Sequence, residues 1–248
     1  MKNIYVITFL CLSFSANAQL RIGVKGGISI PNLEGNSEQS KGYTSRQGTF
    51  GGLILNFKLT HLLSLQPEIN FSPQGGKCNG IQRVPLDAMN GISLPAGINL
   101  YANFKNTTIL NYLEVPELLK FTLGHKLKYY TCFGPHIAFL LKAKTKASGS
   151  SLMYLDEAGT IPIKVNEDQL PPVSFNSATD IKESIKTINA GMQGGLGLQY
   201  PMGPGSIFFE GRTVIGIINI QTHPGTDGKN QTGSLVLATG YLVKIKFK

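Results

Sequence analysis

The four histidines are the first candidates for catalysis or metal binding, and their positions favour neither. His61, His125, His136 and His223 are widely separated, and no pair has the spacing of metal ligands. Residues 191–197 (GMQGGLG) have the composition of a dinucleotide-binding loop, but they lie inside an alternating strand pattern and no helix pattern follows. Nucleophile-elbow, Walker and zinc-protease spacings do not occur. We therefore expect no catalytic, cofactor or metal site.

Charged residues are the second group that could do chemistry, because many of them lie at every second position of alternating segments. Such positions share one face of a strand, opposite the apolar face. The charged members of this polar face are Arg21, Lys25, Lys58, Glu68, Glu114, Lys120, Glu210, Arg212 and Lys244. If the face surrounds a narrow interior, opposite charges should pair there, since unpaired buried charge is costly. We predict a packed polar network.

Three further lysines, Lys142, Lys144 and Lys146, recur at alternate positions where the fifth such segment ends. Ammonium groups in this arrangement suit the phosphates of lipopolysaccharide. A solvated strand end explains the three lysines equally well, so both interpretations stay open.

Alternation of apolar and polar residues dominates the chain and predicts eight β-strands. Residues 62–72 are the clearest case, with Leu63 and Leu65 on one face and Gln66 and Glu68 on the other. The predicted strands cover residues 20–30, 50–59, 62–72, 110–123, 128–142, 187–200, 206–218 and 234–247. Each is about long enough to cross a bilayer, which takes roughly 9–11 tilted residues.

The connections between these segments alternate in length. Short ones fall near residues 60–61, 124–126 and 201–205, and long ones cover residues 31–47, 73–109, 143–186 and 219–233. Outer-membrane barrels sort their connections in this way, with tight periplasmic turns and longer outer loops. A soluble sandwich gives no reason for such sorting.

These features predict an all-β fold, an eight-stranded antiparallel up-and-down transmembrane β-barrel with short periplasmic turns and long outer loops. In hydrocarbon every backbone polar group needs an internal partner, which a closed barrel provides. Eight strands leave an interior that side chains can fill, so we expect a filled lumen rather than a porin channel. Aromatic residues near the short turns predict an interfacial girdle on the apolar face; they are Phe57, Phe121, Tyr129, Tyr200 and Phe247.

One charged residue disagrees with this pattern. Glu117 falls on the predicted lipid face in mid-strand. Pro116 beside it predicts a bulge that resets the facing of the strand.

The N-terminus has the pattern of a cleaved secretory signal peptide at residues 1–18. Lys2 precedes a short apolar run, and the small-x-small sequence Ala-Asn-Ala at 16–18 predicts cleavage before Gln19, leaving residues 19–248 as the barrel domain. A membrane anchor is the alternative, but the apolar run is short and no basic stop follows it.

Charge and cysteine content fit an exported protein. The net charge of +9 falls to +8 without Lys2, and for an exported chain this favours anionic lipid headgroups over nucleic acid as partners. Cys78 and Cys132 could pair in an oxidising compartment, but their spacing gives no disulfide framework, so unpaired thiols are favoured.

Three segments carry a family resemblance: residues 23–27 (GVKGG), 111–121 (NYLEVPELLKF) and 134–136 (GPH). Together they resemble the PorT-like family of outer-membrane β-barrel proteins. The resemblance covers roughly residues 19–248, and its most specific part is Leu-Glu-Val-Pro at 113–116. It implies an eight-stranded outer-membrane barrel and little about activity. One family member is tied to secretion and gliding, a role that nothing in this sequence marks.

The leading hypothesis is a non-enzymatic, monomeric outer-membrane barrel without a cofactor, acting structurally or as a binding surface through its extracellular loops. Its expected partners are outer-membrane lipid, lipopolysaccharide and a cell-envelope protein. One alternative is a lipid-modifying outer-membrane enzyme, which would need a Ser–His pair at one height of the outer rim. His136 does not fit this requirement, because it falls on the alternate positions of its strand that face the lumen. The other alternative is a soluble periplasmic β-sandwich that binds a ligand.

Overall fold

The computed structural model describes residues 19–35, 42–84, 99–165, 168–224 and 228–245. The predicted signal peptide at residues 1–18 and the aromatic Phe247 lie outside these ranges. Within them, no helix is long and apolar enough to span a membrane.

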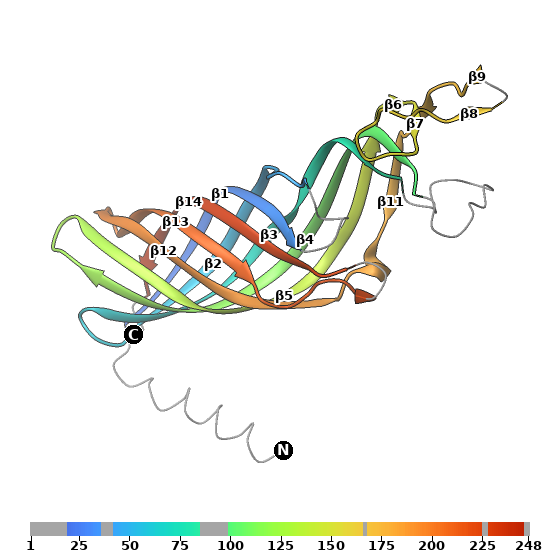
Figure 1. Ribbon diagram of the computed structural model, residues 1–248. Helices are drawn as coiled ribbons and strands as arrows, with labels where there is room; N and C mark the ends of the chain where they lie inside the picture. Colours follow the sequence, from blue (N-terminus) through green and yellow to red (C-terminus); the bar gives the residue numbers. More distant parts are fainter. Residues whose placement is uncertain (1–18, 36–41, 85–98, 166–167, 225–227, 246–248) are drawn as a thin grey trace, which may run out of the picture.

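Eight long antiparallel strands form a closed ring (Figure 1). They are β1 (Gln19–Gly35), β2 (Gly48–Lys58), β3 (Leu63–Arg83), β4 (Tyr101–Leu123), β5 (Lys128–Ser148), β12 (Ile188–Met202), β13 (Gly205–Gly216) and β14 (Asn230–Lys244). Each long strand pairs with the next in the chain, and β14 returns to pair with β1. The ring confirms the predicted barrel and excludes the β-sandwich alternative, whose sheets would have open edges.

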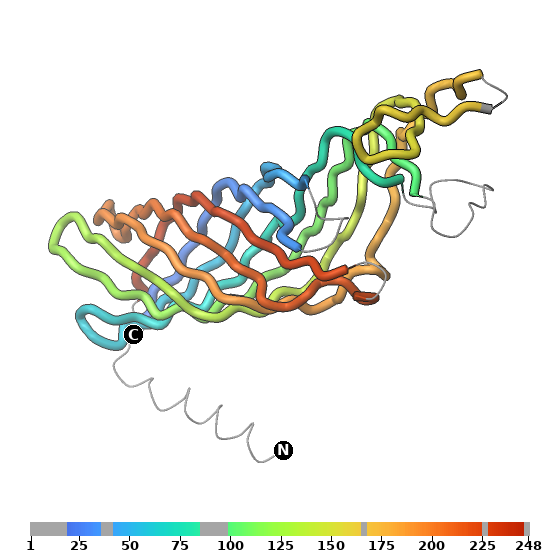
Figure 2. Tube along the Cα trace, in the orientation of Figure 1, coloured from blue at the N-terminus to red at the C-terminus, as the bar shows by residue number. Residues whose placement is uncertain are grey.

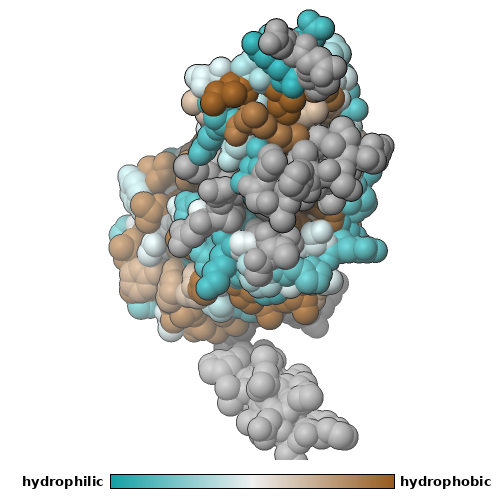
Figure 3. Space-filling model, turned by 45° about the vertical axis from the view of Figure 1, so that its right-hand side comes forward, coloured by the Kyte–Doolittle hydropathy of each residue, from teal (hydrophilic) through white to brown (hydrophobic). Residues whose placement is uncertain are grey.

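Side chains alternate between the lumen and the outside along each strand. On β5, buried and exposed residues alternate from Tyr129 to Leu141. The outward residues are large and apolar, and Phe133 and Leu196 remain 57% and 69% exposed. Figure 3 shows brown, apolar side chains over much of the visible barrel body. Such a surface suits contact with hydrocarbon rather than water.

Several strands are longer than the alternation of residues predicts. β3 continues to Arg83 and β4 begins at Tyr101, so most of the predicted loop at residues 73–109 is a hairpin. β5 likewise continues to Ser148. The pattern missed these extensions because polar residues such as Lys77 and Asn79 occupy outward positions, where a membrane strand requires apolar ones.

The extended strands lead into a small lobe at one end of the barrel (Figure 2). Its short strands are β6 (Ser150–Ser151), β7 (Met153–Tyr154), β8 (Lys164–Val165), β9 (Asp168–Gln169), β10 (Val173–Ser174) and β11 (Ser177–Asp180), followed by the 3-10 turn η2 (Lys182–Ser184). β7 pairs with β4 and β11 pairs with β5, so the lobe continues the barrel wall. Its core is Val84, Leu100, Ala102, Phe104 and Phe175, with the rings of Phe104 and Phe175 stacked at 4.6 Å.

The opposite end of the barrel carries the short turns. They join β2 to β3, β4 to β5 and β12 to β13. Gly124 and Gly203 lie in two of them at φ values of 99° and 58°, in the left-handed region that glycine adopts without a steric penalty. The predicted alternation of short and long connections is confirmed.

The predicted bulge at Pro116 is wrong. Both ladders of β4 keep the same register on either side of Pro116, and buried and exposed residues alternate through it. Glu117 therefore faces outward, opposite Pro67 of β3. Nothing in the described part of the chain pairs with its carboxylate, and no feature of the fold explains it.

A bulge lies instead near the end of β5. The β4–β5 ladder pairs Tyr112 with Leu140 but Asn111 with Lys142, which leaves Leu141 as an extra residue. Beyond Leu141 the facing of β5 is reset, so Lys142 and the next two alternate lysines face outward. Without the bulge, Lys142 would share the lumen face with Leu140.

Candidate functional site

Four charged side chains form a closed set of ion pairs inside the lumen, which we call the ionic quartet. Lys25 of β1 donates to Glu68 of β3 at 2.7 Å and to Glu210 of β13 at 3.0 Å. Arg212 donates to the same two carboxylates, at 2.8 Å to Glu68 and 2.9 Å to Glu210. None of the four side chains is more than 1% exposed. Two cations thus balance two carboxylates away from solvent, a condition under which buried charge is tolerated.

Neutral side chains saturate the quartet's carboxylates. Gln66 and Asn70 donate to Glu68 at 2.8 and 3.0 Å. The Tyr130 hydroxyl donates to Glu210 at 3.2 Å. Gln66, Asn70 and Tyr130 were not among the predicted network residues, although each lies at an alternate position that faces the lumen, and this position was the signal that could have found them.

Glu114 joins the quartet through Gln193. The Gln193 amide donates to Glu114 at 3.1 Å, and its oxygen accepts from Arg212 at 2.9 Å. His136 is buried beside this pair on the lumen face, and its Nδ1 has no hydrogen-bond partner among the described residues.

Five of the nine predicted charged residues form no ion pair with the described residues: Arg21, Lys58, Lys120, Lys244 and Glu114. The expectation that opposite charges pair is therefore wrong for these five. Arg21 and Lys244 lie opposite each other at the short-turn end, and Lys58 stands at the same end of β2. The physical reason is that the described lumen face carries no acidic residue there.

The lumen also contains apolar layers, which the predicted polar network did not include. One layer, which we call the lower apolar layer, lies between the quartet and the short turns and contains Ile54, Leu118, Tyr130, Cys132, Phe208 and Leu242. A second contains Phe50, Val214, Val236 and Ala238. Polar and apolar side chains therefore fill the barrel in alternate layers.

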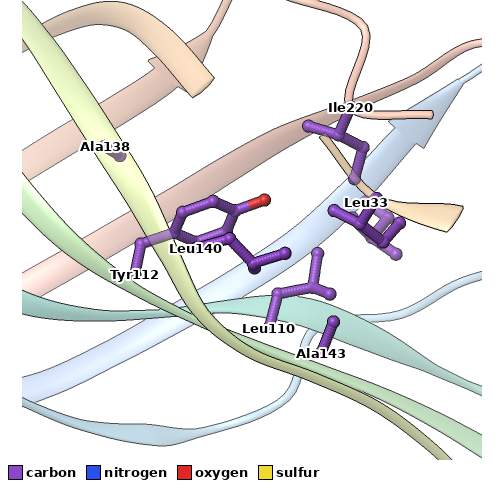
Figure 4. Close-up of a cluster of buried hydrophobic side chains, with 8 residues drawn as sticks. Leu33, Leu110, Tyr112, Ala138, Leu140, Ala143 and Ile220 are labelled. Atoms are coloured by element: carbon purple, nitrogen blue, oxygen red, sulfur yellow. The ribbon is translucent and has the colours of Figure 1, made fainter. Parts of the chain in front are cut away.

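A third apolar cluster closes the lumen at the lobe end (Figure 4). Its members are Leu33, Leu110, Tyr112, Ala138, Leu140, Ala143, Ile185 and Ile220. Ile220 comes from the connection between β13 and β14, and its backbone bonds to Lys186 and Asn230 hold that connection over the mouth. Figure 4 shows Ile220, Leu33 and Leu110 converging from different segments.

A model of the outer membrane protein beta-barrel domain family matches residues 14–221. The chain belongs to this family. Similar solved structures include Ail of Yersinia pestis, at 12% identity over 90% of this chain and 99% of that chain with a TM-score of 0.35. Neisserial surface protein A matches at 12% identity over 90% and 97% with a TM-score of 0.38, and OprG of Pseudomonas aeruginosa at 10% over 92% and 98% with 0.35. The comparison with curated proteins finds no match.

Membership in the outer-membrane barrel family orients the molecule. Short turns of such barrels face the periplasm and long connections face outward, so the lobe is extracellular. Phe57, Phe121, Tyr129 and Tyr200 lie on the outward face near the periplasmic turns. Phe71, Leu113 and Phe139 form one cross-strand row at the extracellular side of the apolar surface.

Just beyond this row, the barrel carries outward-facing lysines, which we call the lysine strip: Lys77, Lys142, Lys144 and Lys146. Lys142 follows directly on the bulge at Leu141. Lys77 and Lys146 flank Thr107 in one cross-strand row. Asp180 of β11 lies opposite Lys144, so the strip carries a net positive charge that one acid reduces. The alternation of residues predicts Lys142 on the lumen face of its strand; this is wrong, because the bulge turns it outward.

The extracellular lobe of the barrel has its own polar features. An open groove of about 480 Å³ is lined by Asn79, Asn103, Lys105, Ser148 and Tyr154, among others. In the neighbouring turn, Asp156 accepts hydrogen bonds from Thr160 and Ile161. Slight desolvation raises the pKa of the Asp156 carboxyl, but these hydrogen bonds outweigh it and hold the pKa below its ordinary value.

The remaining candidate residues lie apart from one another in the barrel. His61 and His125 are in periplasmic turns, and His223 is exposed in the last extracellular connection. In the described part of the chain, no three His, Cys, Asp or Glu side chains come together as a metal site would need. Cys78 and Cys132 are both free thiols and buried, Cys78 on the extended part of β3 and Cys132 in the lumen.

Proposed function

We propose that this outer-membrane barrel is a non-enzymatic surface protein that acts through its extracellular lobe, and that its lumen conducts no solute. The observation that carries the proposal is the contrast between the two ends. Apolar layers and the ionic quartet fill the lumen, while β3, β4 and β5 continue beyond the apolar surface into a lobe with its own core. Binding surface is thus concentrated outside the membrane, and a cell-envelope protein is its proposed partner.

The lysine strip supports a specific role for the base of the lobe: binding the phosphates of lipopolysaccharide. Its lysines face outward immediately beyond the aromatic row of Phe71 and Phe139, where the outer leaflet places its phosphate groups. An ammonium near an anionic membrane surface contributes about 1 kcal/mol of binding free energy. Three or four such groups on one face would hold lipopolysaccharide during purification.

The experiment replaces Lys142, Lys144 and Lys146 together with glutamine and measures the lipopolysaccharide that co-purifies from native membranes. The expected result is a loss of about tenfold or more, because three charge contacts of this size are removed. The matched control changes Lys126, Lys164 and Lys229 to glutamine; these three exposed lysines lie off the strip and remove the same charge.

Heat-modifiable gel mobility checks that both triple variants fold. Equal lipopolysaccharide retention in the strip variant and the wild type would remove this role. An equal loss of lipopolysaccharide from both triple variants would show that its retention depends on net charge and not on the lysine strip.

We also propose the finer assignments that follow from the sequence: membership of the PorT-like branch, cleavage of the signal peptide before Gln19, and a monomeric state. N-terminal sequencing of the membrane-extracted protein tests the cleavage, with Gln19 as the expected first residue. Of the four histidines, His136 faces the lumen and His61 and His125 lie at the periplasmic end, so these three are not at the outer rim where a lipid-modifying enzyme would need a Ser–His pair.

A further inference from the structure

The periplasmic end of the lumen contains a group of cations, which we call the periplasmic vestibule. Its charged members are Arg21, Lys58, Lys120, Lys128 and Lys244, from β1, β2, β4, β5 and β14. All five have lumen parity at the short-turn end of their strands. The described residues place no carboxylate on the lumen face at this level. Glu68 and Glu210 already bind Lys25 and Arg212 and form no ion pair with any of the five, although their charges do act on Lys120.

The cations converge on one space rather than lying scattered. β5 and β1 stand four places apart in the ring of eight long strands, so they form opposite walls. Arg21 lies opposite Lys244 in the β1–β14 ladder, and Lys58 lies opposite Gln19, two residues before Arg21. Lys128 on the far wall is near enough for the charges of all three to act on it. Repulsion among cations held this close costs free energy unless an anion lies between them.

Buried donors without acceptors line the same space. Gln199 is 2% exposed, and its Nε2 has no hydrogen-bond partner among the described residues. The Nε of Arg21 is likewise buried without a partner. Lys120 is 3% exposed; its Nζ lies 3.6 Å from the centroid of the Tyr130 ring and 3.5 Å from Gln199 Oε1. Donors and an ammonium are thus in place, and an acceptor is what would satisfy them.

The shape of the vestibule limits the size of its occupant. The lower apolar layer lies above it on five strands. Leu118, Tyr130 and Leu242 are the next lumen-facing residues above Lys120, Lys128 and Lys244, Phe208 comes from β13, and Ile54 lies above Lys58 with Asn56 between them. A polypeptide therefore cannot thread inward past this layer, which favours a small anion as the occupant. Cations on several walls favour an anion whose charge is spread over oxygens on all sides, and phosphate has this property.

We propose that the periplasmic vestibule is a binding site for a phosphate-class anion, held by Lys128, Lys244, Lys58 and Arg21, with Lys120 and Gln199 forming its roof. The source is either free phosphate or pyrophosphate in the periplasm or the headgroup of an inner-leaflet phospholipid. The site lies at the opposite end of the barrel from the lobe and the lysine strip. Its test is therefore independent of the test of the function proposed above.

The test uses the full mature barrel in an uncharged detergent and titrates pyrophosphate and orthophosphate by calorimetry at constant ionic strength. The expected result is saturable one-to-one binding. The rim variant Lys128→Gln with Lys244→Gln should weaken binding about tenfold or more, because charge-assisted hydrogen bonds are lost. Both rim residues are partly or fully exposed, so the variant is expected to fold. The control, Lys164→Gln with Lys229→Gln, removes equal charge at the extracellular end of the barrel.

A second arm measures which lipids the wild type and the rim variant retain, by native mass spectrometry from nanodiscs of phosphatidylcholine with phosphatidylglycerol. Phosphatidylglycerol retention that the rim variant loses identifies the headgroup as the source, and binding in the calorimeter alone identifies the free anion. No binding by the wild type in either arm overturns the proposal. Binding that the rim variant keeps, or that chloride and sulfate match, overturns it as well.

Discussion

At the scale of single residues, the four members of the quartet are the side chains whose substitution should cost the barrel most stability. Glu68 accepts from Lys25, Arg212, Gln66 and Asn70 with its two oxygens. Its carboxylate therefore accepts from four side chains, whereas that of Glu210 accepts from three. Removing one member of a buried ion pair leaves an uncompensated charge, which costs more than the pair itself contributes.

Glu68→Ala is accordingly expected to lower the free energy of unfolding by about 3–5 kcal/mol. The measurement is urea unfolding in detergent, followed by the shift between folded and unfolded gel mobility. The double variant Glu68→Gln with Lys25→Met restores charge balance and should recover part of the loss. A double variant less stable than Glu68→Gln alone would show that the ion pairs do not govern this site.

The residues that carry the quartet could be predicted from the sequence, because the parity of Lys25, Glu68, Glu210 and Arg212 along alternating strands selects the lumen face. Their partners across the barrel could not, since a single sequence does not reveal which strands' side chains meet at one height. For the same reason, the sequence did not show that Gln193 and Tyr130 form hydrogen bonds with the quartet, although both lie at lumen-facing positions.

At the scale of elements, one extra residue in β5 decides what the lysine strip faces. Leu141 interrupts an otherwise regular alternation, and the lysines beyond it face outward as a result. The sequence gives no direct signal for a bulge between Leu140 and Lys142, and Pro116, which did suggest one, sits in a regular stretch of β4. Alternating hydropathy predicted the membrane-spanning parts of the strands well. It did not predict their polar extensions, because the extensions lack an apolar face.

Deleting Leu141 should therefore be tolerated, since it turns the bulge into a regular ladder and leaves Lys142 outward. The matched control deletes Ile137, a regular outward residue, and reverses the facing of every residue beyond it on β5. Heat-modifiable mobility should persist for the first deletion and disappear for the second. Loss of the folded form on deletion of Leu141 would mean that the bulge itself is required.

At the scale of the whole molecule, the two proposed binding regions lie at opposite ends of the barrel, and the filled lumen separates them. Closing the ring satisfies the backbone within hydrocarbon, and the layered lumen closes the path between periplasm and exterior. The extracellular lobe and the periplasmic vestibule then offer separate surfaces, one to the cell's surroundings and one to the periplasm. This division depends on the lumen remaining filled.

Single-molecule conductance in a planar bilayer tests that dependence most directly. Purified mature protein, checked for the folded form by its gel mobility, is inserted and recorded at both polarities over a range of salt concentrations. The filled lumen predicts a membrane that stays at baseline current after insertion. A stable, large open state that recurs in independent insertions would contradict it.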